Sequence, residues 1–213
     1  VAAVVTQRPD QGEDAIEKAI VEYETLEPLI DVEQAMVSKT LIYEECGSNI
    51  VMGTVEMGMP DNTGDEIFKD CEVVVKGRFM NQRVAPCPLE ARGSAATWIN
   101  GRLIQWISTQ HAQGVRTEVV KANKIDAENV RIITPDVGGG FGAKISAYSE
   151  ELLLGNIAKH VGKAVRWRET RSESMISLGH GRAQLQYITI GGTKAGRVKA
   201  YQLNAIQDSG GWV

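Results

Sequence analysis

Residues 137–144 read Val-Gly-Gly-Gly-Phe-Gly-Ala-Lys, and they lie between two stretches of regular pattern. Residues 130–134 before them are strand-like, and a helical pattern runs through residues 146–160 after them. Glycine adopts positive φ readily and lets a backbone approach a ligand closely. A strand, a glycine-rich turn and a helix start together predict free main-chain N–H groups for an anion or a polar ligand. The aromatic Phe141 within the loop predicts one wall of a pocket.

Two familiar glycine motifs do not match this loop. The Rossmann fingerprint Gly-x-Gly-x-x-Gly would need a glycine at position 143, where Ala143 stands. A P-loop ends in Gly-Lys followed by Ser or Thr, whereas Lys144 follows Ala143 and precedes Ile145. A tight strand-to-helix turn without a ligand stays open as the alternative for a generic triple glycine.

The composition is that of an ordinary globular protein. The 213 residues suffice for one large or two small domains, with 43% hydrophobic and 23% charged residues. A net charge of −4 argues against a nucleic-acid surface. No apolar run approaches the ~18 residues that a transmembrane helix needs, and no signal-peptide pattern is visible.

Cysteine usage favours a reducing cytoplasm. The three cysteines are odd in number and lack Cys-x-x-Cys spacing, so we expect neither a disulfide framework nor a zinc or iron–sulfur cage. The histidines also lack metal-ligand spacing, and we expect no protein metal ligands. His111 is at most adjacent to a pocket, while His160 and His180 are expected at the surface.

The chain reads as mixed α and β. Residues 1–36 suggest β-α-β, with strands at 1–5 and 20–24 and a helix at 14–21. Residues 37–64 are polar and rich in Gly and Asn, and 61–64 form a predicted turn. Further strands are predicted at 71–79, 94–99, 103–108, 130–134, 165–167, 184–190 and 197–207.

Two helices and two hairpins stand out in the later part. Asn100-Gly101 is a strong hairpin signal, and paired glycines join the last two strands. A helix at 110–122 would place Val115, Val119 and Ala122 on one face, and a helix at 149–161 would end at Gly162. Both chain ends fall within patterned sequence, so we expect a piece of a longer polypeptide; a trimmed or processed terminus is the alternative.

Three segments occur in one order: 84–93 (Val-Ala-Pro-Cys-Pro-Leu-Glu-Ala-Arg-Gly), 106–110 (Trp-Ile-Ser-Thr-Gln) and 136–144. Together they resemble the large, molybdenum-binding subunit of the xanthine oxidase family, the molybdenum hydroxylases. Segments 167–173 and 208–211 are similar to the same subunit. The resemblance covers nearly the whole chain.

The resemblance implies an α+β fold in three parts. Residues 1–36 would be the end of an α/β hammerhead-like domain and 37–64 a linker. Residues 65–213 would be the first part of a molybdopterin-binding domain of mixed sheets and helices. It also implies a cytoplasmic dimer of heterotrimers, in which this piece joins the remainder of the large subunit.

The resemblance further implies cofactors that the chain does not hold alone. A molybdopterin, often extended as a cytosine dinucleotide, would carry molybdenum. FAD and [2Fe-2S] clusters would lie on an FAD subunit and an iron–sulfur subunit, because this chain has neither cluster cysteines nor a flavin fingerprint. The substrate would be a small molecule.

The same resemblance assigns site residues. Gln110 would hydrogen-bond an oxo ligand of molybdenum, because an amide NH₂ donates without adding charge. Taken alone, Gln110 would be better interpreted as a strand-end residue that caps the next helix. Gly139, Gly140, Phe141 and Gly142 would line the cofactor, with Phe141 near the substrate, so Gln110 and Phe141 are the catalytic candidates. Arg182 would contact a phosphate or a substrate carbonyl, although a surface role is open.

Two further positions, Glu90 and Ile145, bear on the catalytic base and on the substrate class. Glu90 is expected to be a structural carboxylate paired with Arg92 rather than a general base, which in the family lies much nearer the C-terminus. Purine-hydroxylating members carry glutamate where this chain has Ile145. An apolar residue cannot grip a heterocycle by a hydrogen bond, so the carbon-monoxide-dehydrogenase-like and aldehyde-oxidising branches are favoured.

The resemblance implies an oxidoreductase that hydroxylates an aldehyde, carbon monoxide or a heterocycle with oxygen derived from water. The piece by itself is expected to be inactive. A non-catalytic nucleotide-binding or assembly module, and a truncated inactive copy, are the alternatives that the residues leave open.

Overall fold

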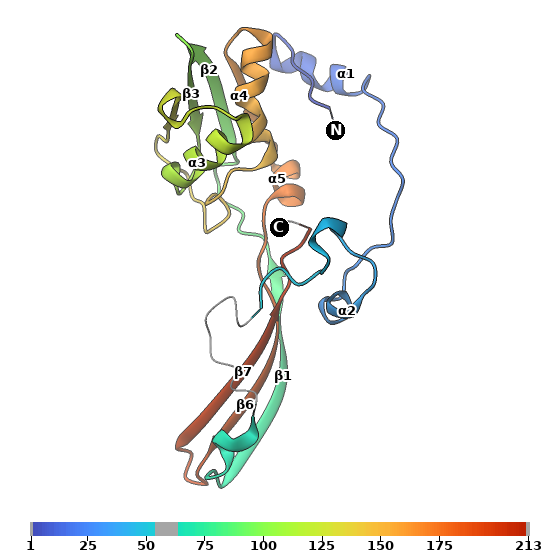
Figure 1. Cartoon of the computed structure of the whole chain (residues 1–213), viewed down its shortest axis with the longest axis vertical. Coiled ribbons are helices and arrows are strands. Elements are labelled where there is room, and N and C mark those ends of the chain that lie inside the picture. Colours follow the sequence, from blue (N-terminus) through green and yellow to red (C-terminus); the bar gives the residue numbers. More distant parts are fainter. Residues whose placement is uncertain (1, 54–63, 212–213) are drawn as a thin grey trace. The chain divides into compact units, whose positions relative to one another are not determined.

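A computed structural model describes residues 2–53 and 64–211 of the chain. It divides into two compact units, Val1–Val51 and Met52–Val213 (Figure 1). Helices and sheets both contribute, which confirms the predicted α+β class. Within the described ranges, none of the helices has the length and apolar character that crossing a membrane would require.

The first unit contains only short helical segments in its described residues. They are η1 (Pro9–Gln11), α1 (Gly12–Ile16), α2 (Val32–Val37) and η2 (Glu44–Cys46). The strands predicted at 1–5 and 20–24 are wrong for the residues described there, and the predicted helix 14–21 ends early, at Ile16. Ile16 is 61% exposed and Ile20 is 87% exposed, so the apolar stripe has no surface to pack against. Short helices without such packing are marginal in water.

The predicted boundaries at residues 36 and 64 stay predictions. The predicted linker includes η2, and most of the turn predicted at 61–64 lies outside the described residues.

A four-stranded sheet organises the upper part of the second unit. Its order is β4 (Val130–Ile133), β3 (Arg102–Ile107), β2 (Gly93–Ile99) and β5 (Val165–Arg168). The β2–β3 and β2–β5 pairs are antiparallel, and β3 pairs with β4 in parallel. Asn100 and Gly101 both have positive φ, 49° and 79°, as a two-residue hairpin turn requires. The hairpin and the strand predicted before the glycine loop are therefore confirmed.

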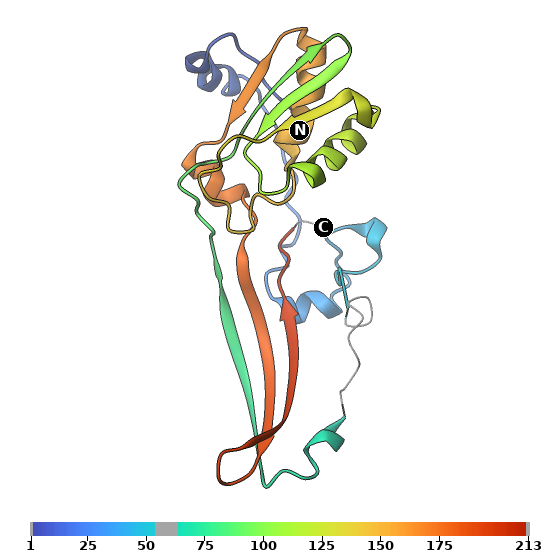
Figure 2. The ribbon, with the colours of Figure 1, turned by 90° about the vertical axis from the view of Figure 1, so that its left-hand side faces the viewer.

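Helices α3 (Ala112–Asn123) and α4 (Ser149–Val161) cover this sheet (Figure 2). The core that they enclose is apolar and consists of Ala96, Leu103, Ile107, Val115, Val119, Val130, Leu154 and Ala158. Gly162 ends α4 at φ 67°, as predicted. Ala122 is exposed, contrary to the prediction. The inner face of α3 continues instead at Asn123, whose Nδ2 donates to the Leu152 carbonyl at 2.9 Å.

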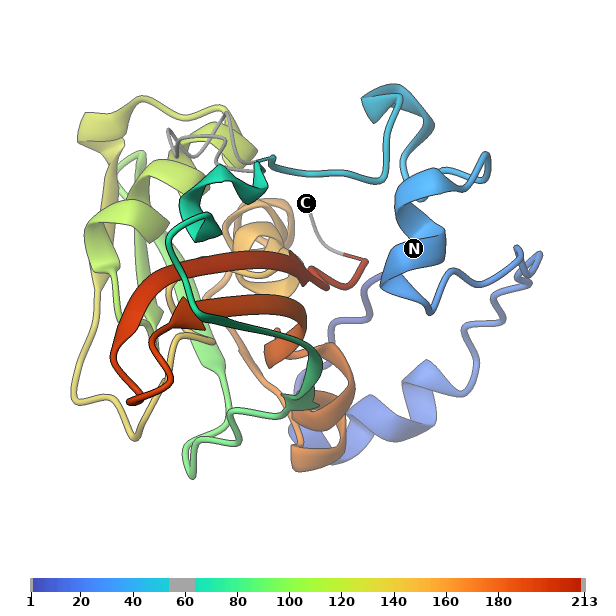
Figure 3. The ribbon, with the colours of Figure 1, turned by 90° about the horizontal axis from the view of Figure 1, so that it is seen from below.

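A second, three-stranded antiparallel sheet has the order β1 (Val73–Val84), β6 (Gly181–Gly192) and β7 (Val198–Gln207). The predicted strand at 71–79 and the predicted second hairpin are confirmed. The 3-10 turn η3 (Asp65–Phe68) lies against this sheet, as the view in Figure 3 shows. There, a Cβ on Gly191 would lie 2.7 Å from Phe68 Cδ1, so glycine admits the ring. The short η4 (Ala127–Asn129) and α5 (Arg171–Ser177) complete the unit.

Candidate functional site

The end of β3 and the glycine loop meet at Gln110. The main-chain N–H of Gln110 donates to the Lys144 carbonyl at 2.8 Å. The side-chain Oε1 of Gln110 accepts from the Gly142 N–H at 3.0 Å and the Lys144 N–H at 3.2 Å. Segments more than 30 residues apart in the sequence are therefore joined by three hydrogen bonds.

These bonds orient the Gln110 amide. An oxygen that accepts two N–H donors cannot be exchanged with the NH₂ group, since N–H groups would then face each other. Nε2 must consequently point away from the loop backbone. Within the described residues, no acceptor contacts Nε2, and Gln110 is exposed. An uncharged donor is thus held in place with its hydrogens available.

Three loop positions require glycine. A Cβ on Gly140 would lie 2.3 Å from Gln110 Oε1, so any side chain there would displace the amide. Gly139 and Gly142 have φ values of 98° and 90°, which L-residues rarely adopt. The glycines therefore allow the loop to close on Gln110.

The loop was predicted to present free main-chain N–H groups. This holds for three residues of the loop, whereas three other N–H groups donate to side chains of the protein. The N–H groups of Gly138, Gly142 and Lys144 donate to the side chains of Glu90 and Gln110. Among the residues that the structure describes, no acceptor contacts the N–H groups of Gly139, Gly140 and Phe141. Three consecutive donors therefore lie in the loop whose backbone holds the Gln110 amide.

Phe141 lies open rather than in a sealed core. Its side chain is 74% exposed and its φ is 53°, an uncommon value for a bulky residue. Ile145, at 48% exposure, adds a second accessible apolar group to the same loop. The loop combines polar main-chain donors with apolar side chains, a combination typical of small-molecule sites.

Glu90 pairs with Lys144, and the expected pairing with Arg92 is wrong. Lys144 Nζ lies 2.7 Å from Glu90 Oε2, and the lysine side chain is fully buried. Burial acts to raise the pKa of Glu90, but hydrogen bonds from Lys144, Ser108 and the Gly138 N–H outweigh it and lower the pKa. A carboxylate with a lowered pKa is too weakly basic to serve well as a general base near neutral pH, in agreement with the structural role expected.

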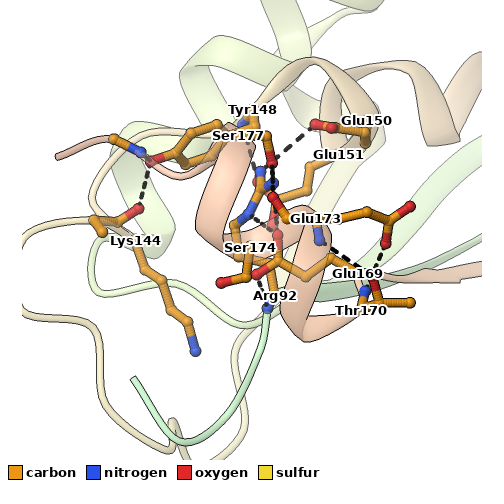
Figure 4. A network of polar contacts seen from close by, with 12 residues as sticks. Arg92, Lys144, Tyr148, Glu150, Glu151, Glu169, Thr170, Glu173, Ser174 and Ser177 are labelled. Carbon is orange, nitrogen blue, oxygen red and sulfur yellow. Dashed lines mark hydrogen bonds and ion pairs between the residues drawn. The ribbon is translucent and has the colours of Figure 1, made fainter. Parts of the chain in front are cut away.

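Arg92 instead belongs to a buried network shown in Figure 4. Its Nε donates to Glu169 Oε2 at 2.8 Å, and its main-chain N–H donates to Glu169 Oε1 at 2.7 Å. The guanidinium lies 3.9 Å from the centre of the Tyr148 ring. Both Arg92 and Glu169 are at most 2% exposed. The network fastens the segment before β2 to the start of α5.

A second buried carboxyl lies beside this network. Glu151 is 2% exposed and accepts a hydrogen bond from the Tyr148 N–H at 2.9 Å. Burial raises the pKa of Glu151 to about 7, and the Tyr148 N–H and the Arg92 charge offset burial only in part. Glu151 therefore changes charge near neutral pH without reaching the glycine loop by any contact described here.

Arg182 lies in β6, exposed and directly opposite Arg83 of β1. In the described structure no contact joins Arg182 to Gln110 or to the glycine loop. His111 is exposed next to Gln110, and His160 is exposed as predicted. His180, predicted at the surface, is half-buried; its Nε2 lies 2.9 Å from the Asp208 carbonyl, and it lines a cavity.

That cavity has a volume of about 280 Å³, and neither Gln110 nor any residue of the glycine loop lines it. It is bounded by residues of the segments 83–87, 174–180 and 210–211. In the described ranges, no group of three or more His, Cys, Asp or Glu side chains could hold a metal ion.

Sequence reasoning missed the polar residues that hold the loop. In the sequence, Lys144 was considered only as a mismatch to the P-loop motif. Ser108 and Glu169 were not predicted to be site residues. One signal was present in the sequence: Lys144 stands between Ala143 and Ile145, directly after a glycine run. A charged residue in such an apolar setting is rarely buried unless it is paired.

Comparison with known proteins bears on the whole chain. Residues 42–213 match the family model of the molybdopterin cofactor-binding domain. The nicotine 6-hydroxylase large subunit of Paenarthrobacter nicotinovorans is 30% identical over 100% of this chain and 26% of its own length. The carbon monoxide dehydrogenase large chain of Afipia carboxidovorans is 30% identical over 99% of this chain and 28% of its own length.

A solved structure agrees with these matches. Quinoline 2-oxidoreductase from Pseudomonas putida 86 has a TM-score of 0.83 and 30% identity, over 94% of this chain and 25% of that chain. The chain thus spans about a quarter of the length of the relatives that it matches. By its sequence and its fold, it belongs to the molybdopterin cofactor-binding domain family, which is found here in large subunits of the xanthine oxidase family.

Proposed function

We propose that this chain forms one wall of the molybdopterin site of a molybdenum hydroxylase. The enzyme would oxidatively hydroxylate a small molecule with oxygen derived from water. The observation that carries the proposal is the Gln110 amide, whose Oε1 is held by the Gly142 and Lys144 N–H groups. Its Nε2 is thereby presented as a neutral, fixed donor.

The residues present fit such a cofactor. Gln110 Nε2 and the N–H groups of Gly139, Gly140 and Phe141 are uncharged donors, suited to oxo groups and to the polar edge of a pterin. At Gly142 a Cβ would meet no heavy atom of the described residues within 4 Å, so this glycine leaves room for a bulky ligand close to the backbone. The bound cofactor would supply the redox chemistry, a two-electron oxidation that the protein side chains cannot perform.

The residues of this chain would position the reacting group and shield the substrate from water. The Gln110 amide would orient the reacting group by a hydrogen bond that adds no charge. Phe141 and Ile145 would form an apolar surface for the substrate and restrict water near it. The overall reaction adds the oxygen of one water to the substrate and releases two electrons and two protons, so an electron acceptor is required.

We propose that this acceptor is reached through partner subunits that carry [2Fe-2S] clusters and FAD. The names of the relatives support this, since they include a large subunit, a large chain and a complex subunit gamma. The cytosine dinucleotide form of the pterin and a dimer of heterotrimers are part of the same proposal. So is a cytoplasmic location, which three free cysteines at Cys46, Cys71 and Cys87 support.

The domain boundaries belong to the proposal as well. Residues 1–36 would form the end of a hammerhead-like domain, residues 37–64 would be the linker between the two domains, and residues 65–213 would form the first part of the molybdopterin-binding domain. The family match starts at residue 42, and the second compact unit starts at Met52. Arg182 remains proposed as a contact to a cofactor phosphate or a substrate carbonyl.

The substrate class is narrowed by Ile145. An apolar side chain there disfavours purines that must be gripped by a carboxylate. Relatives act, by their names, on nicotine, carbon monoxide and aldehydes. An aldehyde, carbon monoxide or a less polar heterocycle is therefore the proposed class.

The alternative of a nucleotide-gripping loop is less well supported. A phosphate site at a glycine loop normally uses a nearby lysine as a point charge. The side chain of Lys144 is fully buried and paired with Glu90, so it cannot extend to a phosphate without breaking that pair.

The proposal is tested on the complete large subunit assembled with its partners. Molybdenum is measured by mass spectrometry, pterin by fluorescence after oxidation, and turnover with an aldehyde and a dye acceptor. Gln110→Ala should retain molybdenum but lower kcat about 10²-fold, as removal of a positioned hydrogen-bond donor does in other enzymes. The matched control is Gln113→Ala, an exposed glutamine on α3. An assembled complex with neither molybdenum nor pterin would refute the proposal.

A further inference from the structure

The side chain of Lys144 is an internal connector. It is fully buried, and its Nζ donates to Glu90 Oε2 at 2.7 Å, to the Glu90 carbonyl at 2.9 Å and to Ser108 Oγ at 3.0 Å. An ammonium group has three donors, and all three have acceptors here. The lysine thus joins the glycine loop to two other segments, the one before β2 and the one after β3.

Glu90 holds the other end of the loop. Its Oε2 also accepts from Ser108 Oγ and, at 2.9 Å, from the Gly138 N–H, while its main-chain N–H donates to the Gly138 carbonyl at 3.2 Å. A Cβ on Gly138 would lie 2.5 Å from Glu90 Cβ, so only glycine allows this approach. The beginning of the glycine run is therefore tied to Glu90 at two points.

The main chain of Lys144 reaches Gln110. Its N–H donates to Gln110 Oε1, and its carbonyl accepts from the Gln110 N–H and from Thr109 Oγ1, both at 2.8 Å. One residue therefore contacts Glu90 with its side chain and Gln110 with its backbone. The three free N–H groups at 139–141 lie between the two fixed points, Gly138 and Lys144.

We propose that the Glu90–Lys144 ion pair, in which the lysine is buried and the carboxylate is partly exposed, is a positioning clamp for the cofactor wall. It holds the loop at both ends, and through the backbone of Lys144 it sets the direction in which Gln110 presents its Nε2. The inference rests on the proposed function for its catalytic consequence, but the clamp itself is a property of the loop. Glu90 and Lys144 act through Gln110 and are positioning residues.

The clamp is tested first by a measurement on the cofactor-free complex that does not depend on catalytic activity. Hydrogen exchange of the peptide covering 137–145 is measured in the complex produced in a host that cannot make molybdopterin. Lys144→Met should speed exchange of the Gly142 and Lys144-position amides about tenfold or more, the loss expected when charged hydrogen bonds disappear. The control is Lys121→Met, an exposed lysine in the last turn of α3. Unchanged exchange in Lys144→Met would overturn the clamp and leave the proposed function standing.

Lys144→Met leaves the partly exposed Glu90 carboxylate without its cation. If that complex fails to assemble, Glu90→Gln decides. It keeps an acceptor for Gly138 and Ser108 and removes only the charge, so a smaller increase in exchange of the same amides is expected. In the cofactor-loaded complex Glu90→Gln should lower kcat with little change in KM. Combined with Gln110→Ala it should add almost nothing, because both changes remove the same oriented donor. Multiplicative losses, or exchange equal to wild type, would overturn the inference, whereas absence of molybdenum would count against the proposed function instead.

Discussion

The two sheets of the second unit use similar hairpins in different surroundings. In the four-stranded sheet, Leu103 of β3 is 0% exposed, because α3 and α4 cover that face. In the three-stranded sheet, Val75, Ile190 and Tyr201 lie opposite one another across β1, β6 and β7. These three side chains are 63%, 40% and 53% exposed. Both hairpins follow from local sequence, but within the described residues the cluster of buried apolar side chains includes strands of the four-stranded sheet alone.

This difference separates pairing from stability. Strand alternation and turn residues determine which strands pair, whereas helices that bury one face supply most of the hydrophobic stabilisation. The glycine loop and Gln110 are attached to the first sheet. The site is therefore carried by the part of the chain in which both polar and apolar side chains are buried. The following changes test that contrast, in order of expected effect.

Glu169→Gln should have the largest effect on stability. It removes the buried carboxylate that pairs with buried Arg92 and leaves only the longer, 3.5 Å ion pair with Glu150; breaking a buried ion pair costs about 3–5 kcal/mol. The comparison is Asp65→Asn, which breaks the Lys76–Asp65 pair beside the three-stranded sheet, where both side chains are more than 60% exposed. That change should have no measurable effect. Urea denaturation of the two variants checks the contrast, and equal losses would contradict it.

Truncation of one leucine in each sheet gives the next largest contrast. Leu103→Ala creates a cavity in the core and should lower the free energy of unfolding by about 3 kcal/mol. Leu203→Ala in β7 removes a side chain that is 46% exposed and should cost less than about 1 kcal/mol. Thermal and urea unfolding measure both. A Leu203→Ala loss as large as that of Leu103→Ala would mean that the second sheet has a core of its own.

Glu151, in the helix α4 that covers the four-stranded sheet, makes the free energy of unfolding depend on pH. Burial raises its pKa to about 7, so folding favours the protonated form. The stabilisation is fully present below the unfolded pKa and is lost as the pH rises towards 7. Glu151→Gln keeps an acceptor for the Tyr148 N–H and should be more stable than wild type at pH 8 by about 3 kcal/mol. Urea titrations at pH 4.5 and pH 8 measure this. A difference that does not depend on pH would contradict the assignment.

An isosteric pair gives the smallest contrast. Val130→Thr places a hydroxyl in the core at β4, where burial without a partner costs on the order of 1 kcal/mol. Val75→Thr makes the same change on an exposed strand and should be within about 0.5 kcal/mol of wild type. Differential scanning calorimetry resolves the two. Equal shifts in Tm would remove the distinction between the two surroundings.

Much of the second unit could be predicted, for local reasons. Asn100-Gly101 determines one turn, Gly162 ends α4, and the periodicity of α3 identifies Val115 and Val119 as core residues. The first unit could not be predicted in the same way. Its strand-like stretch at 20–24 lacks a partner strand, and β-propensity alone does not form a sheet.

The site was predictable in part. The motif order identified Gln110 and Phe141, and the structure brings Gln110 and the loop together. The Glu90–Lys144 and Arg92–Glu169 pairs could not be predicted, because each joins segments more than 50 residues apart. Spacing along the chain carries no information about such partners, and Arg92 was a plausible partner for Glu90 only because it is close in sequence.

The central claim is that the loop at 138–144 and Gln110 face a molybdopterin. The most direct measurement is a crystal or cryo-electron-microscopy structure of the assembled complex loaded with its cofactor. The account predicts that Gln110 Nε2 and at least one N–H group among residues 139–141 lie within hydrogen-bonding distance of the cofactor. A molybdopterin bound elsewhere, with this loop in contact only with protein, would contradict it.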